Sequence, residues 1–238
     1  MVGLVVGLAI LLGCSLVDRV GAPDPGYVPP LLLVFGGSRG DSGNNNYLDT
    51  TVKADSPPYG IDSPTGQPTG RFSNYRNLPD FLSTYLDSEP PSPYLSPQLN
   101  GERLLYGANF ASGGAGILND TGLATRGSTA GGECDPELVN AASLFNSELN
   151  RLVQQLNGRL GLVFVAAANS VTLYTAFRSN PEAYGFTETR VACCGQGPYN
   201  GLGQCTPASN LCPNRDEYVF WDPTNPTTGL WGSLPKPS

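Results

Sequence analysis

The chain has 238 residues, of which 39% are hydrophobic and 14% are charged, with 30 glycines and 22 prolines. This composition predicts one loop-rich globular domain and excludes a disordered chain. Thirteen basic against 20 acidic side chains give a net charge of −7, which argues against nucleic acid and anionic membrane surfaces as partners.

The N-terminal segment is apolar over most of residues 2–17, and Asp18, Arg19 and the small residues Gly21 and Ala22 follow it. This pattern predicts a secretory signal peptide over residues 1–22, cleaved near Ala22. Residues 23–238 would then form a single domain of a secreted, extracellular protein without a stable membrane span. A membrane anchor is the alternative, but the apolar run is short for a span and Pro23 follows directly.

The next apolar run, residues 31–35, lies between Pro30 and Gly36 and is too short for a helix, so it predicts a buried strand. Ser38 follows this strand closely. In α/β proteins the carboxyl edge of the sheet is where ligands and reacting groups lie. Ser38 is therefore the candidate nucleophile.

Three general motifs overlap this serine. Gly36-x-Ser38-x-Gly40 fits a nucleophile elbow, although turn-forming residues rather than a helix follow. A phosphate-binding glycine loop would require Gly-Lys-Ser/Thr, which is absent from this segment. Arg39-Gly40-Asp41 spells a cell-adhesion tripeptide, a pattern that recurs by chance.

Longer motifs resemble the amino-terminal half of the plant GDSL esterase/lipases, a branch of the SGNH hydrolases. They are Phe-Gly-x-Ser-x-x-Asp-x-Gly-Asn-Asn from residue 35, and residues 57–62, 68–74 and 107–117. The resemblance implies a flavodoxin-like three-layer α/β fold and a secreted serine esterase, without cofactor or metal, that acts on carboxyl esters such as acyl lipids. The family's Gly-Asp-Ser-Leu is Gly36-Gly37-Ser38-Arg39 here, so the aspartate that helps hold the turn and the leucine that packs behind it are replaced.

The central part of the family pattern is incomplete. Residues 104–111 predict a strand that delivers a glycine turn to the same sheet edge as Ser38. By resemblance Gly116, or less favourably Gly114, would donate its amide to the oxyanion together with the Ser38 amide. After Gly122 the family's Gly-x-Asn-Asp block has no counterpart, so we expect part of the central region to be missing.

The rest of the chain contains residues that typically start or end helices. Asn77 opens a short helix through Tyr85, and Asp135 with Pro136 starts a longer helix that Gly158 would end. Residues 162–168 predict a buried strand, followed by a helix over 170–177; this order predicts a parallel sheet. The apolar residues at helical spacing in the longer helix are expected to face the core: Leu138, Ala142, Phe145, Leu149, Leu152 and Leu156.

Four cysteines, Cys193, Cys194, Cys205 and Cys212, lie in a Gly/Pro/Asn-rich segment and predict two disulfides whose pairing the sequence leaves open. Cys134 would be left over. A zinc site is the alternative, but paired Cys-x-x-Cys spacings and histidines are absent. Asn119 begins the only glycosylation sequon.

The C-terminal segment resembles the family again from residue 180 to residue 223. The family continues Asp-x-x-His-Pro, whereas this chain continues Asp222-Pro223-Thr224-Asn225-Pro226 and contains no histidine. The resemblance implies that Asp222 orients the base, yet Asn225 at the histidine position cannot take a proton. Asp222 alone, with an ordinary pKa of about 4, would be an inefficient base.

These departures predict a shortened or aberrant family member. The segment from residue 228 shows no sign of the family's closing helix, so the domain would be incomplete at the C-terminus as well as in the middle. We expect marginal stability or aggregation, because a sheet without its central elements has exposed edges. The predicted function is a strongly impaired hydrolase of lipid carboxyl esters; the alternative is a non-catalytic secreted ligand-binding or decoy protein.

Overall fold

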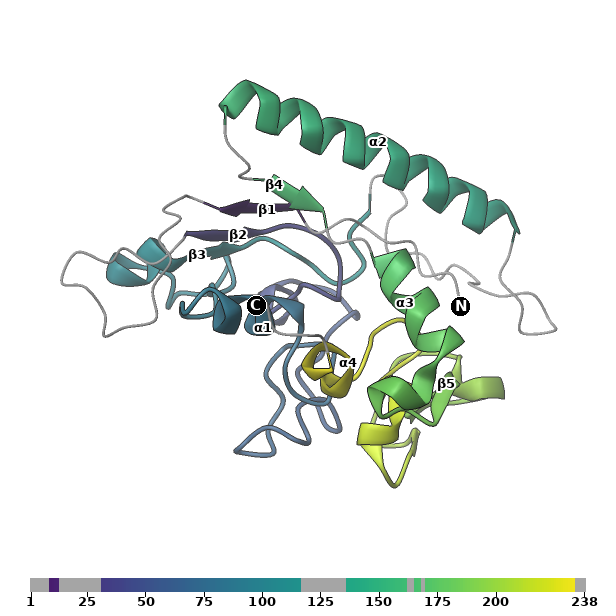
Figure 1. Cartoon of the computed structure of the whole chain (residues 1–238). Coiled ribbons are helices and arrows are strands. Elements are labelled where there is room, and N and C mark those ends of the chain that lie inside the picture. The colour runs from purple at the N-terminus through teal and green to yellow at the C-terminus, as the bar shows by residue number, and fades with distance from the viewer. Residues whose placement is uncertain (1–8, 13–30, 117–135, 162–164, 168–169, 234–238) are drawn as a thin grey trace.

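A small four-stranded sheet lies between the helices labelled α2 and α1 in Figure 1. The computed structural model describes residues 9–12, 31–116, 136–161, 165–167 and 170–233. The sheet has the order β3-β2-β1-β4, formed by Ala9–Leu12 (β1), Leu32–Val34 (β2), Gly107–Asn109 (β3) and Val165–Ala167 (β4). β2 pairs in parallel with β3, and β1 pairs antiparallel with both β2 and β4.

The predicted parallel direction holds for three strands of the sheet, whereas the fourth strand, β1, is antiparallel to its neighbours. β2, β3 and β4 run in the same direction, since β2 and β4 are both antiparallel to β1. β1 itself was not predicted, because it lies within the segment interpreted as a signal peptide. It occupies the place between β2 and β4, and the cleavage of residues 1–22 stays a prediction.

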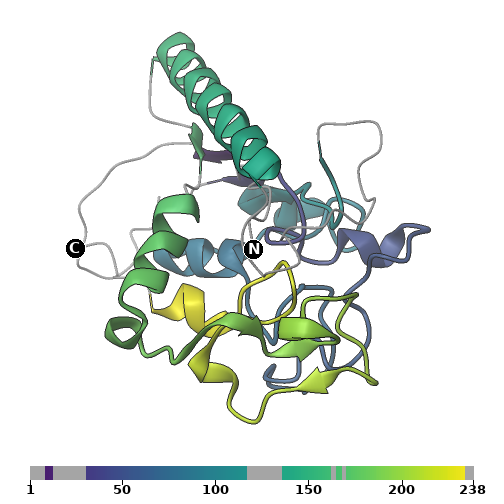
Figure 2. The same ribbon diagram turned by 90° about the vertical axis from the view of Figure 1, so that its right-hand side faces the viewer.

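The helices flank this sheet on two sides. In both Figure 1 and Figure 2 the helix α2, Pro136–Leu160, lies above the sheet and α1, Leu78–Tyr85, lies below it. The third helix, α3, spans Ser170–Ser179, so all three predicted helices are confirmed. α2 continues past Gly158, and Gly161 with φ 74° follows its end.

Two boundaries differ from the prediction. The strand predicted over 104–111 is confined to β3, because Gly101–Tyr106 forms a 3₁₀ helix (η2). The segment from residue 228, predicted to be non-helical, forms the short helix α4, Thr228–Gly232. Leu230 and Trp231 are 0% and 3% exposed, so burial of these two side chains accounts for the added turn of helix.

The predicted core face of α2 is confirmed in part. Ala142 is buried and Phe145, Leu149 and Leu156 are half-buried, whereas Leu152 is 48% exposed. The side chain of Leu138 lies outside the described residues. A helix of 25 residues is about 37 Å long, whereas four strands span only about 15 Å. The narrow sheet therefore covers only part of α2, which packs against β4.

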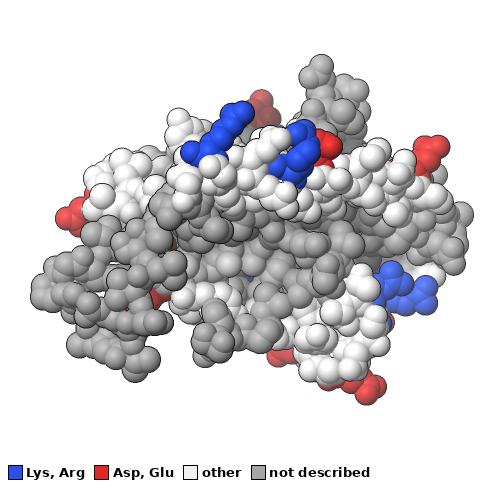
Figure 3. Space-filling view, turned by 45° about the horizontal axis from the view of Figure 1, so that its top comes forward, with Lys and Arg blue, Asp and Glu red and all other residues white. Residues whose placement is uncertain are grey.

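The surface on the α2 side carries scattered charges. Figure 3 shows acidic and basic side chains scattered over this face. On α2 itself, Arg151 and Glu148 form an exposed ion pair at 2.6 Å. Charges of one sign do not gather in a patch among the described residues of this face. No helix in the described parts of the chain is both long and apolar enough to cross a membrane.

The C-terminal third is built from short strands and two disulfides. Glu188–Ala192 (β5) pairs in parallel with Tyr218–Phe220 (β8), and Cys194–Gly195 (β6) pairs antiparallel with Asn210–Leu211 (β7). The remaining described elements are short 3₁₀ helices at Asn44–Tyr47 (η1), Pro181–Tyr184 (η3), Pro198–Asn200 (η4) and Arg215–Glu217 (η5).

The disulfides join Cys193 to Cys212 and Cys194 to Cys205, which confirms two bridges in this segment and makes the zinc alternative wrong. Cys134 lies outside the described residues. All four bridged cysteines belong to one buried cluster, together with Tyr59 and Trp221. The bridges therefore support the same core that carries the residues around Asp222.

Removal of one disulfide should destabilise this core. We predict that the double change Cys194→Ser/Cys205→Ser lowers the free energy of unfolding by about 2–4 kcal/mol, because it releases a loop constraint and places hydroxyls in a buried cluster. Urea unfolding measures the loss. Cys134→Ser is the matched control, since that cysteine is predicted to be unpaired; an equal loss in the control would contradict the prediction.

The place of β1 in the sheet gives a second prediction. A chain that begins at residue 23 lacks β1, so β2 and β4 lose their shared partner and present open edges. We predict that it unfolds at lower urea than the full chain and associates at micromolar concentration, as measured by light scattering. A chain that begins at residue 9 keeps β1 and serves as the control. A monomeric 23–238 chain with unchanged unfolding would contradict the prediction.

Candidate active site

The turn that carries Ser38 leaves the end of β2 at Gly36. Gly36 has φ 143°, a conformation that favours glycine. The turn closes through hydrogen bonds from the Gly40 amide to the Gly37 carbonyl (3.0 Å) and from the Asp41 amide to the Ser38 carbonyl (3.3 Å). No α-helix follows directly, as expected, and Ser38 is half-buried.

Asp41 joins this turn to the glycine turn after β3. Its carboxylate is fully buried and accepts hydrogen bonds from the amides of Gly43 and Asn44 at 2.7 Å and of Gly113 at 2.9 Å. Burial raises the pKa of Asp41 above its ordinary value, and the backbone donors partly oppose this rise. The Asp41 side chain therefore fixes the two turns relative to one another.

The glycine turn contains the candidate oxyanion donors. The Gly113 amide is already bound to Asp41, so it is not free to bind an oxyanion. Gly114 and Gly116 are exposed, and their amides bind no acceptor among the described residues. A Cβ atom at Gly37 would lie 3.7 Å from the Ala115 carbonyl oxygen, so the two turns are neighbours. The assignment to Gly116 stays a prediction.

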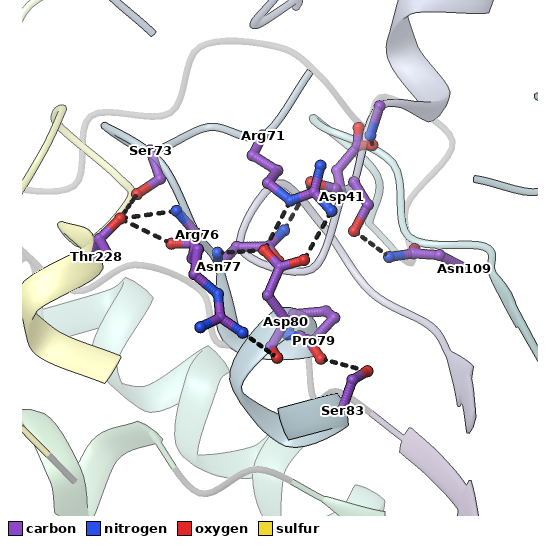
Figure 4. Close-up of polar contacts among 12 residues, drawn as sticks. Asp41, Arg71, Ser73, Arg76, Asn77, Pro79, Asp80, Ser83, Asn109 and Thr228 are labelled. Carbon is purple, nitrogen blue, oxygen red and sulfur yellow. Dashed lines mark hydrogen bonds and ion pairs between the residues drawn. The ribbon is translucent and has the colours of Figure 1, made fainter. Parts of the chain in front are cut away.

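An ion pair between Arg71 and Asp80 lies close to Asp41 (Figure 4). Two hydrogen bonds of 2.7 Å connect the guanidinium to both carboxylate oxygens. Asp80 also accepts the Asn77 amide at 2.8 Å at the start of α1, and Asn77 Nδ2 donates to the Asp41 carbonyl at 2.9 Å. The start of α1 is thereby bound to the turn of Ser38.

The C-terminal segment is attached to the same scaffold through Thr228. Its hydroxyl accepts the Arg76 amide at 2.8 Å and donates to the Arg76 carbonyl at 3.1 Å, as Figure 4 shows. The Thr228 amide donates to Asn74 Oδ1 at 2.8 Å. These bonds hold the segment that follows Asn225 against the N-terminal half of the chain.

Asp222 lies in the loop after β8 and is 3% exposed. Oδ1 accepts the amides of Thr224 and Asn225 at 2.8 Å and the Thr224 hydroxyl at 3.1 Å. Burial raises the pKa of Asp222 above its ordinary value, although the hydrogen bonds from Thr224, Asn225 and Tyr59 lower it.

Asn225 is held against this carboxylate. Its Nδ2 lies 2.9 Å from each oxygen of Asp222 and 2.9 Å from the Thr224 hydroxyl. Its Oδ1 is buried and accepts no hydrogen bond from the part of the chain that the structure describes. An amide nitrogen can donate to the carboxylate as an imidazole N–H would, but the amide offers no basic nitrogen.

Tyr59 is a site residue that the sequence analysis missed. Its hydroxyl donates to Asp222 Oδ2 at 2.9 Å, and the residue is 1% exposed. Burial, followed by the negative charge of Asp222, raises the pKa of Tyr59 far above its ordinary value, so the hydroxyl remains a donor. Tyr59 lies within residues 57–62, which contributed only to the family resemblance; a separation of 163 residues hides its contact with Asp222.

Arg39 brings the turn of Ser38 to the loop of Asp222. Its Nε donates to the Thr224 carbonyl at 3.1 Å, and its Cζ lies 5.0 Å from the centre of the Tyr174 ring. The predicted nucleophile and the Asp222–Asn225 pair thus lie in one region of the molecule. No hydrogen bond joins the Ser38 hydroxyl to Asn225. Asn119 lies outside the described residues.

Comparison with known proteins identifies the class. GDSL esterase/lipase At4g28780 and GDSL esterase/lipase LTL1 of Arabidopsis thaliana are 38% and 37% identical to the chain, over 82% of the chain and 82% of each relative. GDSL esterase/lipase 7 of the same plant is 28% identical over 83% of the chain and 84% of the relative. No model of a protein family matches the chain.

The chain therefore belongs to the plant GDSL esterase/lipase family, whose members share the SGNH hydrolase fold. The alignment with the LTL1 protein spans 301 positions, more than the 238 residues of the chain. The relative accordingly has residues at positions where this chain has none, which agrees with a shortened member.

The contact between Tyr59 and Asp222 makes a testable contribution to stability. We predict that Tyr59→Phe lowers the free energy of unfolding by about 1–3 kcal/mol at neutral pH, because the buried carboxylate loses a donor. The pKa of Asp222, already raised by burial, should rise further. Protonation of Asp222 removes most of the penalty, so the loss should shrink as the pH falls through this raised pKa.

Urea unfolding of both proteins at neutral and acidic pH measures this difference. Tyr47→Phe is the matched control, since Tyr47 is exposed and its hydroxyl bonds to Ser96 alone among the described residues, at 3.3 Å. A loss in Tyr59→Phe that does not change with pH would show that the hydroxyl stabilises the fold independently of the charge on Asp222.

Proposed function

We propose that the chain is a secreted GDSL-type serine esterase that acts on carboxyl esters of lipids, and that its turnover is strongly reduced by Asn225. The proposal includes a flavodoxin-like three-layer fold, glycosylation at Asn119 and removal of residues 1–22, which would take β1 out of the sheet. Membership of the family supports the reaction class, and the two disulfides are compatible with export.

In the proposed reaction the Ser38 hydroxyl attacks the carbonyl carbon of the ester. The amides of Ser38 and Gly116 donate to the oxyanion that forms, and Asp222 holds the residue at position 225. No metal or cofactor takes part. Each of these residues lies on a turn or loop that the hydrogen bonds of Asp41, Arg39 or Asp222 fix.

The observation that carries the proposal is the contact between Asn225 and Asp222. Both bonds of 2.9 Å come from the amide nitrogen, so residue 225 is oriented by the carboxylate but offers no base. A serine hydroxyl needs a base to become an effective nucleophile. Loss of the base of a triad lowers turnover by roughly a thousandfold to a millionfold.

A second function is a secreted ligand-binding or decoy protein without turnover. The contact between Asn225 and Asp222 also supports this function, because it stabilises the buried carboxylate. Asn225 provides Asp222 with two amide hydrogen bonds and is 1% exposed, so the site remains packed without a histidine. A packed site of this kind can hold an ester or its product even where the chemical step is slow.

Restoration of the base tests the proposal. We predict that Asn225→His raises the hydrolysis of short-chain p-nitrophenyl esters by roughly a thousandfold or more, because an imidazole held by Asp222 can take the Ser38 proton. Gly37→Asp alone should not raise the rate, although a Cβ there meets only an ordinary contact of 3.7 Å.

Two controls separate base chemistry from changes in packing. Asn225→Gln enlarges the side chain without adding a base and should leave the rate low, and Ser38→Ala in the Asn225→His protein should abolish the gain. A wild-type rate typical of an intact esterase, lost in Ser38→Ala, would refute the impairment. Ester binding with no turnover in either the wild type or the Asn225→His protein would favour the ligand-binding function.

A further inference from the structure

Buried polar atoms without a partner gather beside the Asp222 loop. Among the described residues they include Arg39 Nη1, the Tyr174 hydroxyl and Asn225 Oδ1. Trp221 Nε1 is also unpartnered, but its ring packs against Tyr59 in the disulfide cluster. Arg39 links Tyr174 and Asn225, since it donates to the carbonyl of Thr224, the residue before Asn225, and lies over the Tyr174 ring. Buried polar groups in folded proteins nearly always have a partner, so such a group of orphans indicates a place for a ligand.

The charge of Arg39 narrows the chemistry of that ligand. Among the described residues no carboxylate forms an ion pair with its guanidinium. Asp222 is the acidic group of this loop, and its oxygens already accept hydrogen bonds from Tyr59, Thr224 and Asn225. A partly buried cation without a counter-charge favours an anionic ligand.

The chemistry of each unpartnered group shows whether it can donate a hydrogen bond to an anion. Asn225 Oδ1 is an acceptor and cannot hold an anion, so Arg39 and Tyr174 remain. Burial raises the pKa of Tyr174 above its ordinary value, which keeps its hydroxyl a donor. A planar guanidinium with one positive charge matches a planar carboxylate with one negative charge.

We propose that Arg39 and the Tyr174 hydroxyl bind the carboxylate of an acyl chain next to Ser38. This rests on the proposed function, since such a carboxylate is the acid product of ester hydrolysis. The family motif has leucine where Arg39 stands, and leucine cannot bind an anion.

Exposed aromatic side chains near the same sheet edge suit the alkyl part of such a ligand. Phe35 follows β2 and Phe110 follows β3; their rings stack at 5.1 Å, and they are 39% and 38% exposed. Tyr94 lies 4.7 Å from the Phe110 ring and is exposed as well. Burial of alkyl carbons against these rings would add to the affinity without distinguishing an acid from its ester.

Calorimetric titration of the full chain with octanoate and with methyl octanoate tests the proposal. These probes share the alkyl chain and differ in the charge. We expect octanoate to bind more tightly, and Arg39→Leu to weaken octanoate binding about 10- to 100-fold while methyl octanoate is unaffected. Arg190→Leu removes the same charge from an exposed position on β5 and should leave both affinities unchanged.

Tyr174→Phe is a second variant that tests the site even where Arg39→Leu has a folding defect. It keeps the ring that Arg39 contacts and removes only the hydroxyl. We expect it to weaken octanoate binding several-fold at an unchanged melting temperature. Equal octanoate binding in the wild type and in both variants would overturn the proposal. So would an affinity of octanoate no higher than that of methyl octanoate, or displacement of octanoate by inorganic phosphate at equal affinity.

These outcomes are separate from the test of turnover. The titration requires no chemical step, so the carboxylate site can fail while Asn225→His still gains esterase activity. Conversely, charge-dependent octanoate binding in a protein that Asn225→His does not activate would support the carboxylate site and remove the hydrolase function.

Discussion

The buried carboxylate of Asp222 is the group on which the candidate site depends. It is taken out of water, so its charge is tolerated only because donors surround it. Tyr59 donates from the N-terminal half of the chain, and Thr224 and Asn225 donate from the loop of Asp222 itself. Tyr59 and the neighbouring Trp221 belong to the cluster that contains the disulfides. Tyr59 therefore connects the N-terminal half of the chain to both the disulfide cluster and the loop of Asp222.

Local signals carried most of what the sequence predicted correctly. The helix that begins at residue 78 has an asparagine and a proline at its start, and the strand at residues 32–34 is bounded by proline and glycine. Four crowded cysteines indicated two bridges, but the pairing depends on three-dimensional geometry. The exposure of Leu152 on the predicted core face of α2 has a similar origin, since helical spacing shows which residues share a face and not how far another element covers it.

The contacts that assemble the site were beyond sequence reasoning because they are long-range. Arg39 and Thr224 are 185 residues apart, and no pattern in the chain pairs them. In the sequence Arg39 stood out as part of a tripeptide that recurs by chance and as a departure from the family's leucine, which indicated a loss of packing. In the structure it gains a carbonyl acceptor and an aromatic ring, so the replacement ties the turn to the loop. The strand β1 was missed for a related reason, because an apolar N-terminal segment looks the same whether it is removed or paired in a sheet.

The residue at position 225 separates stability from catalysis. An apolar side chain there would remove two hydrogen bonds from a buried carboxylate, and a hydrogen bond to a charged group contributes about 1.5–3 kcal/mol. Asparagine avoids that penalty, because its amide nitrogen donates to both oxygens at 2.9 Å. What it cannot do is accept a proton from Ser38, so the change removes the base while the packing around Asp222 is kept. The proposed loss of turnover therefore leaves the packing of the candidate site intact, and the unpartnered Oδ1 of Asn225 marks the position at which the family motif has histidine.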